Sequence, residues 1–298
     1  MPALLDLVGN TPLCDISALV GKPGVQVLAK CEGNNPASSV KDRAARGMIL
    51  GAQRRGLLKP GMRLIEATSG NTGIALAMIA QAVGVEMHLV MPETLTIERT
   101  QTMEAFGARV HLIDGNMEAA RDYAEQQVKD TAGKPDAFLM LNQFGNPDNP
   151  LEHYKTTGPE IWRDTSGSIT HFVSAMGTTG TIMGCSRFLK EQNSAVMIVG
   201  CQPTEGSTIP GIRRWSKAYL PTIFEPDRVD RIIDISQKDA EDTTRRLARE
   251  AGLFVGISSG GSAWAALQVA REIDRGVIVF IACDRGDRYL SSDVFKRG

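Results

Sequence analysis

Short runs rich in valine and isoleucine alternate along this chain with longer segments of amphipathic helical character. Examples of such runs are RLIEA at 63–67, HFVSA at 171–175 and VIVFIAC at 277–283. This alternation is typical of parallel β-sheets covered by helices, because the crossover between two parallel strands needs a helix-length connection. The sequence therefore predicts an α/β fold with twisted, mostly parallel sheets.

The chain is long enough for one large domain or two ordinary domains. Its 298 residues are 42% hydrophobic, so it can bury a large core. The strongest interruption in mid-chain is Pro-Asp-Asn-Pro at 147–150, where two prolines flank polar turn residues. A domain crossing is therefore expected near these residues.

Charge and cysteine usage exclude several classes of protein. Lysine and arginine total 33 against 34 acidic residues, which argues against a broad basic surface for nucleic acid. The N-terminus lacks a basic segment followed by an apolar core, and no run approaches the roughly 20 apolar residues of a membrane span, so a cytoplasmic location is predicted. The five cysteines are odd in number and lack C-x-x-C spacing, which disfavours a disulfide framework or a zinc knuckle. No metal site is predicted.

Two loops that follow predicted strands are rich in hydroxyl groups and glycine, and each opens a predicted helix. Ligands of open α/β sheets bind beyond the carboxyl ends of the strands. The loop TSGNTG at 68–73 offers hydroxyls, an amide and unpaired helix N–H groups, which favours an anion such as a carboxylate; an elaborate helix cap is an equal alternative. The loop MGTTGT at 176–181 indicates a phosphate cradle. It matches neither Walker A nor G-x-G-x-x-G, which disfavours nucleotide binding.

Two further loops follow apolar runs. The serine pair of SSGG at 258–261 again offers hydroxyls at the start of a predicted helix, whereas DRGDRY at 284–289 is charged. The serine pair is therefore expected to offer its hydroxyls to a ligand at the sheet edge.

The stretch NNPASSVKDRAA at 34–45 runs from a turn into a helix and places Lys41 near the helix start. By itself this pattern favours a solvated lysine behind a serine cap formed by Ser38 or Ser39. A phosphate cradle, an anion loop and a serine pair elsewhere in the chain favour a different hypothesis: a phosphorylated cofactor that is held covalently by an amine. Pyridoxal phosphate fits that description.

With these residues in view, the sequence resembles the cysteine synthases, which are pyridoxal-phosphate enzymes of fold type II, over essentially the whole chain. The shared motifs are GNTPL at 9–13, NPASSVKDRAA at 35–45, EATSGNTGIALA at 66–77, TTGPEIW at 156–162, GTTGT at 177–181 and GISSGG at 256–261. IPGIRRW at 209–215 and CDRGDRYLSS at 283–292 resemble the B-type branch of that family.

The resemblance implies roles for individual residues. Lys41 carries the cofactor and takes the Cα proton of the substrate, and Asn71 bonds the ring hydroxyl of the cofactor. The residues implied to hold the phosphate are Gly177, Thr178, Thr179, Gly180 and Thr181. Those implied to bind the substrate carboxylate are Thr68, Ser69, Gly70, Thr72 and Gln143.

Ser258 is implied to face the pyridine nitrogen, although the adjacent Ser259 is an alternative. A hydroxyl at this position leaves that nitrogen essentially neutral, whereas a carboxylate would keep it protonated and deepen the electron sink. Loss of a good leaving group from Cβ is then favoured over a long-lived carbanion. The implied activity is a β-replacement that converts O-acetyl-L-serine and sulfide into L-cysteine, with ping-pong kinetics.

The B-type motifs imply a second sulfur donor. Arg213 and Asp284 are implied to lie at the substrate site, where added cationic and polar groups favour an anionic donor such as thiosulfate, with S-sulfocysteine as the product. Surface ion pairs are an equal alternative for Arg213 and Arg214, and Cys283 is expected to be a small buried residue. The open rivals are a sulfide-restricted A-type enzyme and a relative that uses O-phosphoserine. A catalytically silent scaffold is disfavoured because Lys41 is retained.

The resemblance also implies two three-layer domains. A smaller, mobile domain over 36–147 carries Lys41 and the 68–72 loop, and a larger domain from 1–35 and 148–298 carries the phosphate loop. A homodimer that binds small-molecule substrates, with neither nucleic acid nor membrane as a partner, is implied as well.

Overall fold

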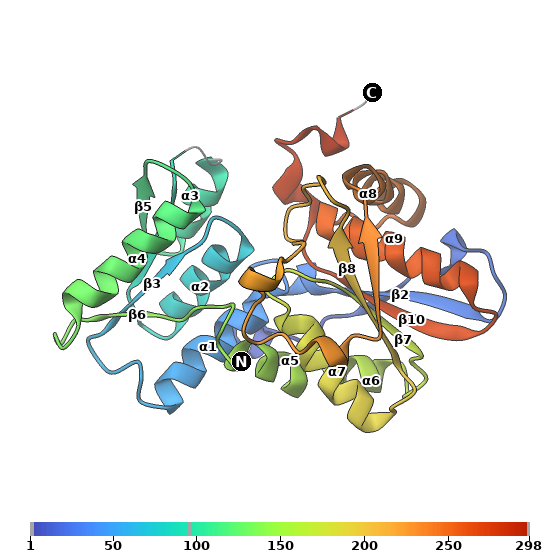
Figure 1. Cartoon of the computed structure of the whole chain (residues 1–298), viewed down its shortest axis with the longest axis horizontal. Helices are drawn as coiled ribbons and strands as arrows, with labels where there is room; N and C mark the ends of the chain where they lie inside the picture. Colours follow the sequence, from blue (N-terminus) through green and yellow to red (C-terminus); the bar gives the residue numbers. More distant parts are fainter. Residues whose placement is uncertain (1–2, 94–96, 297–298) are drawn as a thin grey trace. The chain divides into compact units, whose positions relative to one another are not determined.

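The chain divides into two compact units, each with its own sheet (Figure 1). The computed structural model describes residues 3–93 and 97–296. The first unit comprises Met1–Val8 and Lys41–Asn149, and the second comprises Gly9–Val40 and Pro150–Gly298. Nearly all of the strand pairs are parallel, which confirms the predicted α/β class.

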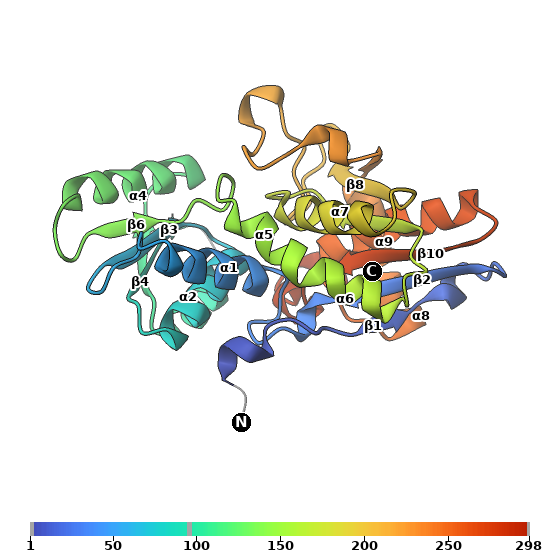
Figure 2. The same cartoon turned by 90° about the horizontal axis from the view of Figure 1, so that it is seen from below.

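The first unit is built on a four-stranded sheet of order β5-β4-β3-β6, and all its strand pairs are parallel. Its strands are β3 (Arg63–Ala67), β4 (Met87–Pro92), β5 (Arg109–Ile113) and β6 (Phe138–Met140). Its helices are α1 (Lys41–Arg54), α2 (Asn71–Ala82), α3 (Ile97–Ala105) and α4 (Met117–Thr131). Figure 2 shows α4 on one face of this sheet and α1 with α2 on the other.

The sequence of β4 explains why this sheet is covered on both faces. All six residues of the run MHLVMP are buried, as expected for a parallel strand with helices on either side. Helix α4 begins where Asn116 caps it, since the Asn116 Oδ1 accepts the N–H groups of Glu118 and Ala119 at 2.9 and 3.1 Å. Apolar residues of α4 then pack on Ile65 of β3.

The second unit is built on a six-stranded sheet of order β1-β2-β10-β7-β8-β9, in which only the β1–β2 pair is antiparallel among the residues that the structure describes. Its strands are β1 (Leu13–Asp15), β2 (Val25–Cys31), β7 (His171–Ala175), β8 (Met197–Pro203), β9 (Arg231–Ile235) and β10 (Gly276–Ala282). Its helices are α6 (Thr157–Asp164), α7 (Gly180–Gln192), α8 (Gln237–Ala251) and α9 (Ile257–Glu272). Helix α5 (Asp148–Lys155) spans the boundary between the two units in the sequence.

Two separate hydrophobic cores cover the faces of this second sheet. One contains Leu247 of α8 and Val269 of α9, and the other contains Ile161 of α6 and Leu189 of α7. The 68–72 loop follows β3 and the 177–181 loop follows β7, so each loop lies at the carboxyl end of a parallel strand. This is the edge at which open α/β sheets bind ligands.

Candidate active site

Lys41 is the first residue of α1 and is half-buried. The residues that precede it are tied to the end of β10: the Val40 N–H donates to the Cys283 carbonyl at 2.8 Å, and Ser39 forms an antiparallel bridge with Asp284. Asp42 follows in the first turn, where its charge suits the positive end of the helix dipole. The backbone that enters α1 at Lys41 is therefore fixed.

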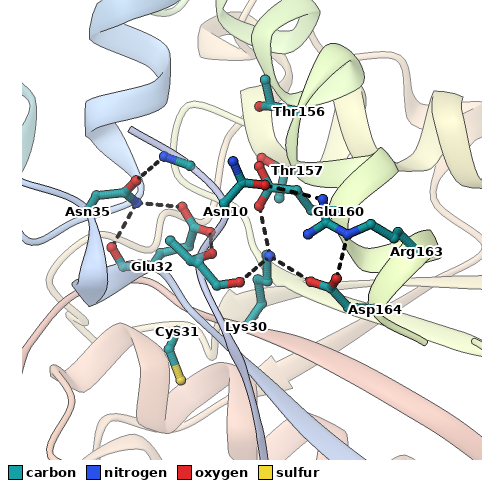
Figure 3. Close-up of polar contacts among 12 residues, drawn as sticks. Asn10, Lys30, Cys31, Glu32, Asn35, Thr156, Thr157, Glu160, Arg163 and Asp164 are labelled. Carbon is teal, nitrogen blue, oxygen red and sulfur yellow. Dashed lines mark hydrogen bonds and ion pairs between the residues drawn. The ribbon is translucent and has the colours of Figure 1, made fainter. Parts of the chain in front are cut away.

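A buried polar network also holds this approach to Lys41 (Figure 3). The Asn35 Nδ2 donates to the carbonyl and to a carboxylate oxygen of Glu32, at 2.9 and 2.8 Å. The same amide donates to the Ser39 carbonyl at 3.2 Å, and the Asn35 Oδ1 accepts the Gly9 N–H at 2.8 Å. One asparagine thus links both ends of the turn that precedes α1.

The network continues to a lysine whose side chain is fully buried. Lys30 donates to the Thr11 carbonyl and pairs with Glu160 at 2.8 Å and with Asp164 at 3.5 Å, while the Thr11 hydroxyl donates to Glu32 at 2.6 Å. Buried charges of this kind persist only when they are paired and hydrogen-bonded. None of these residues was predicted to have a role. Thr11 and Glu160 lie in the motifs at 9–13 and 156–162, which is a signal that could have found them, whereas Lys30, Glu32 and Asp164 lie outside those motifs.

The 68–72 loop in the first unit is already hydrogen-bonded within the protein. Thr72 lies in the first turn of α2, and its Oγ1 donates to the Gln143 Oε1 at 2.8 Å, with both residues buried. The Ser69 carbonyl accepts from the Arg99 guanidinium at 3.0 Å. The structure thus brings together two of the residues predicted to bind a carboxylate. Because the Gln143 Oε1 accepts from Thr72, the NH₂ group of Gln143 is the part of this amide that can donate to a ligand. Thr68 is buried beside them, and Ser69, Gly70 and Asn71 are half-buried.

The 177–181 loop in the second unit has a different character. Thr179 precedes the first residue of α7 and adopts a left-handed backbone with φ of 70°. Its hydroxyl oxygen is buried without a hydrogen-bond partner in the described parts of the chain. A buried hydroxyl that lacks a partner is costly, and this one lies at a helix N-terminus, where anions are favoured. The loop therefore fits a bound phosphate group.

Contacts with the segment 209–215 hold this loop closely. The Trp215 Nε1 donates to the Gly177 carbonyl at 2.8 Å, and the Arg213 N–H donates to the Met176 carbonyl at 2.9 Å. A Cβ placed on Gly177 would lie 2.6 Å from the Gly211 carbonyl oxygen, so only glycine fits there. The sequence pattern predicted that glycines in this loop allow close approach of the backbone. The structure shows that at Gly177 the approaching group is the Gly211 carbonyl.

Thr181 is the second residue of α7, and its hydroxyl lies 3.3 Å from the His153 Nε2. The His153 Nδ1 lies 2.9 Å from the Thr157 Oγ1. His153 is buried and joins α5, α6 and α7 through these contacts. Thr178 and Gly180, the other residues predicted to hold phosphate, are buried in the same loop.

Ser258 and Ser259 lie side by side in the first turn of α9, and both are buried. The Ser259 Oγ accepts the Cys283 N–H at 2.8 Å, so this hydroxyl is engaged in holding the end of β10. The Ser258 side chain instead faces Gly211, where an added Cβ would lie 3.5 Å from the Ser258 Oγ. Of the two alternatives, the contacts favour Ser258 as the residue that is available to a ligand.

The charged residues singled out in the sequence lie in contrasting surroundings. Asp284 is buried, and its Oδ2 accepts from the Tyr289 hydroxyl at 2.7 Å. Arg214 donates to the Pro203 carbonyl at 2.8 Å and pairs with Asp234 on the surface. The Arg213 side chain is exposed, while its backbone is anchored beside the phosphate loop. Cys283 is half-buried.

Glu66, one residue before the end of β3, was not predicted to have a role. It is buried, and burial raises the pKa of its carboxyl to about 7, against the opposing effect of the N–H groups of Asn142 and Leu141. A buried carboxylate with a raised pKa beside a candidate site is a feature that only the structure reveals.

Within residues 3–93 and 97–296, no helix is long and apolar enough to cross a membrane. Over the same residues, no group of three or more histidine, cysteine, aspartate or glutamate side chains is arranged to hold a metal ion.

Comparisons with known proteins place the chain in a family. Residues 4–284 match the family model described as pyridoxal-phosphate dependent enzyme. Cysteine synthase B of Pseudomonas aeruginosa is 57% identical over 296 residues, which cover 99% of this chain and 97% of that protein. Cysteine synthase B of Escherichia coli (strain K12) is 55% identical over 297 residues, which cover 99% and 96% of the two chains.

Solved structures agree with these matches. A cysteine synthase from Entamoeba histolytica superposes with a TM-score of 0.93 at 37% identity, covering 99% of this chain and 90% of that one. An O-ureido-L-serine synthase superposes with a TM-score of 0.91 at 33% identity, covering 100% and 97%. The chain therefore belongs to the pyridoxal-phosphate dependent enzymes, as a member of the cysteine synthase family.

Proposed function

We propose that this protein is a transferase that makes L-cysteine from O-acetyl-L-serine and sulfide by pyridoxal-phosphate-dependent β-replacement. The observation that carries the proposal is the 57% identity, over 99% of the chain, to a cysteine synthase B. The buried Thr179 hydroxyl, which has no partner among the described residues, supports the cofactor assignment because it lies where a helix N-terminus favours an anion.

The family resemblance indicates which residues would hold the cofactor. Lys41 would bind it covalently and Asn71 would bond its ring hydroxyl. Its phosphate would be held by the loop Gly177, Thr178, Thr179, Gly180 and Thr181. Ser258 would face the pyridine nitrogen, whereas the Ser259 Oγ already accepts the Cys283 N–H. Pyridoxal phosphate, when bound, supplies an electron sink for negative charge at the substrate Cα.

The first unit supplies the groups that would bind and deprotonate the amino-acid substrate. Thr68, Ser69, Gly70, Thr72 and Gln143 bind its carboxylate through hydroxyl, amide and helix N–H donors. Once the substrate amine displaces it from the cofactor, the freed Lys41 amine would take the Cα proton, after which the bond between Cβ and the acetyl oxygen breaks and acetate leaves. Sulfide then adds to Cβ, and Lys41 returns the proton to Cα, so that cysteine and acetate are the two products.

Thiosulfate is a second sulfur donor under this proposal. The observation that favours it is Arg213, whose backbone is bonded to Met176 beside the phosphate loop while its guanidinium is exposed. A cation held at that place attracts an anionic donor. Asp284 has a less direct part, because its carboxylate is buried against Tyr289 and so orders the loop after β10.

An absorption spectrum of the purified protein tests cofactor and reaction together. We expect a visible band from the bound cofactor that changes when O-acetyl-L-serine is added and returns when sulfide or thiosulfate follows. Parallel assays with O-phospho-L-serine separate this activity from that of phosphoserine-using relatives, and a strict need for sulfide would indicate the A-type reaction. A colourless protein that takes up no pyridoxal phosphate would contradict the proposal.

Lys41→Ala should reduce cysteine formation by at least about 10³-fold, because one residue both binds the cofactor and moves the proton. Lys59→Ala is the matched control, since Lys59 is an exposed lysine of the same unit. Equal activity in wild type and Lys41→Ala would show that the assigned mechanism is wrong.

The proposal also covers the location, the oligomeric state and the domain motion of the enzyme. The enzyme acts in the cytoplasm as a homodimer, and the smaller domain over 36–147 moves relative to the rest when substrate binds. Sedimentation analysis tests the dimer. Small-angle scattering with and without substrate tests the motion.

A further inference from the structure

Glu66 lies close to the predicted carboxylate site, but it is not among the residues predicted to bind the carboxylate. It faces the end of β6, where the chain leaves the sheet and turns toward Gln143. The Glu66 Oε2 accepts the Asn142 N–H at 3.0 Å, and both residues lie in the first unit. The contact therefore ties β3, which leads into the 68–72 loop, to the turn that carries Gln143.

This turn has a backbone that needs external support. Asn142 adopts a left-handed conformation with φ of 55°, which a residue other than glycine visits at some energetic cost. Its carbonyl accepts the N–H groups of Gly145 and Asn146, at 3.0 and 2.9 Å, and the Asn149 Nδ2 donates to the Gln143 carbonyl at 2.8 Å. Glu66 supports the same turn through the Asn142 N–H.

We propose that Glu66 is a positioning residue for substrate binding: its carboxylate fixes the turn at Asn142 and thereby holds the Gln143 amide in the orientation set by Thr72. The inference rests on the proposed function, since it assigns the substrate carboxylate to Gln143. The Thr72 Oγ1 already donates to the Gln143 Oε1 at 2.8 Å, so a shift of the turn would separate the pair and misdirect the Gln143 NH₂ group.

The surroundings of Glu66 support a specific role over simple packing. The residue paired with it on β4 is Leu89, and a carboxylate is expensive to bury among such neighbours unless it is bonded. Burial raises its pKa to about 7, and Arg121 of α4 is the charged group whose field favours the ionised form. The chain thus tolerates an acid where an apolar residue would stabilise the fold more easily.

The test compares substitutions at the two ends of β6. Glu66→Ala removes an acceptor for a backbone N–H at the carboxyl end of the strand, beside Gln143. Thr131→Val is the matched control, since the Thr131 Oγ1 accepts the Phe138 N–H at 3.0 Å at the amino end. Both changes remove a bond from a side chain to the same strand, but only the first lies next to the candidate site. Glu66→Gln, which retains one acceptor oxygen, serves as the conservative rescue.

We expect Glu66→Ala to raise the KM for O-acetyl-L-serine about tenfold with kcat within about threefold, and Thr131→Val to leave both unchanged. Glu66→Gln should recover most of the loss. Because a raised pKa means that stability is lost as pH rises through about 7, Glu66→Gln should melt at or above wild type at pH 8. Lower affinity without lower stability would separate positioning from structural support.

Binding of L-alanine and L-alaninamide, followed by the absorption of the bound cofactor, gives a readout that is independent of turnover. Glu66→Ala should weaken the binding of L-alanine about tenfold and leave the binding of L-alaninamide, which lacks the carboxylate, unchanged.

Equal weakening of binding for both ligands, or a KM like that of wild type, would overturn the inference about Glu66 but not the proposed cysteine synthesis. A wild-type enzyme that makes no cysteine but binds L-alanine in preference to the amide would instead overturn the proposed reaction and leave the role of Glu66 intact. If Glu66→Ala does not fold, Glu66→Leu, which fills the buried space but removes the acceptor, takes its place, and a KM like that of Thr131→Val would overturn the inference.

Discussion

The 68–72 loop and the 177–181 loop have similar positions in their sheets and similar composition, but their hydroxyl groups differ in hydrogen bonding. Each follows a buried parallel strand and opens a helix, and each is rich in threonine and glycine. In the first loop the Thr72 hydroxyl is bonded to Gln143, whereas in the second the Thr179 hydroxyl is buried with no partner in the described chain. A site for a passing substrate can be complete in the protein alone, while a site for a resident cofactor is completed by that cofactor.

Gly177→Ala should produce the largest effect on this comparison. An added Cβ would lie 2.6 Å from the Gly211 carbonyl oxygen, and backbone atoms cannot move aside easily. We expect a loss of stability of about 2 to 3 kcal/mol in the cofactor-free protein and a still larger loss of pyridoxal-phosphate affinity, because the cradle itself is displaced. Thermal unfolding of the cofactor-free protein and a cofactor titration measure the two effects.

Gly206→Ala in the same unit is the control, since a Cβ added there would have no atom within 4 Å and only the positive φ of 79° strains the change. A Gly177→Ala protein as stable as Gly206→Ala would show that the close approach to Gly211 is not a constraint.

Thr179→Val should change the cofactor-bound and cofactor-free proteins in opposite directions. Valine keeps the β-branched shape and removes a buried hydroxyl without a partner, so the cofactor-free protein should be as stable as wild type or more so. Loss of a hydrogen bond to a charged phosphate should weaken pyridoxal phosphate binding by about 10- to 150-fold, which corresponds to about 1.5 to 3 kcal/mol for bonds to charged groups. A variant that destabilises the cofactor-free protein would contradict the contrast between the loops.

Thr72→Val should have the smallest effect, and its direction is the reverse of that for Thr179. It leaves the buried Gln143 Oε1 without its donor, so the cofactor-free protein should lose about 1 kcal/mol of stability. The KM for O-acetyl-L-serine should rise several-fold while cofactor affinity stays unchanged. Denaturant unfolding and steady-state kinetics measure these quantities. A lower affinity for the cofactor with a normal KM would assign Thr72 to the cofactor site and not to the substrate site.

Much of the architecture could be predicted from local patterns. The apolar run at 63–67 became β3 and the run at 171–175 became β7, because buried parallel strands need continuous apolar residues. The pairing of Thr72 with Gln143 agrees with their shared assignment to one ligand, although that assignment came from the family resemblance and not from spacing. The functional roles of Asn71, Ser258 and Arg213 remain predictions for the experiments above.

Other features were beyond the reach of the sequence because they depend on contacts between distant residues. Nothing in the local pattern of EATSGN distinguishes Glu66 from a solvated acid, since its partner Asn142 is 76 positions away. The buried Lys30 reads as an ordinary charged residue in a strand until Glu160 is folded against it. The two serines of SSGG are equivalent in sequence, and the contacts with Cys283 and Gly211, which are distant in the chain, distinguish them.

The sequence by itself therefore determined the α/β class, the helix-starting loops and the position of Lys41 at a helix start, because these follow from periodicity and from residue types that act locally. The tertiary structure alone decided which of these hydroxyls form hydrogen bonds within the protein and which buried charges support the site. Hydrogen-bond satisfaction depends on the three-dimensional neighbours of each polar atom, and those neighbours come from strands and helices that are far apart in the chain.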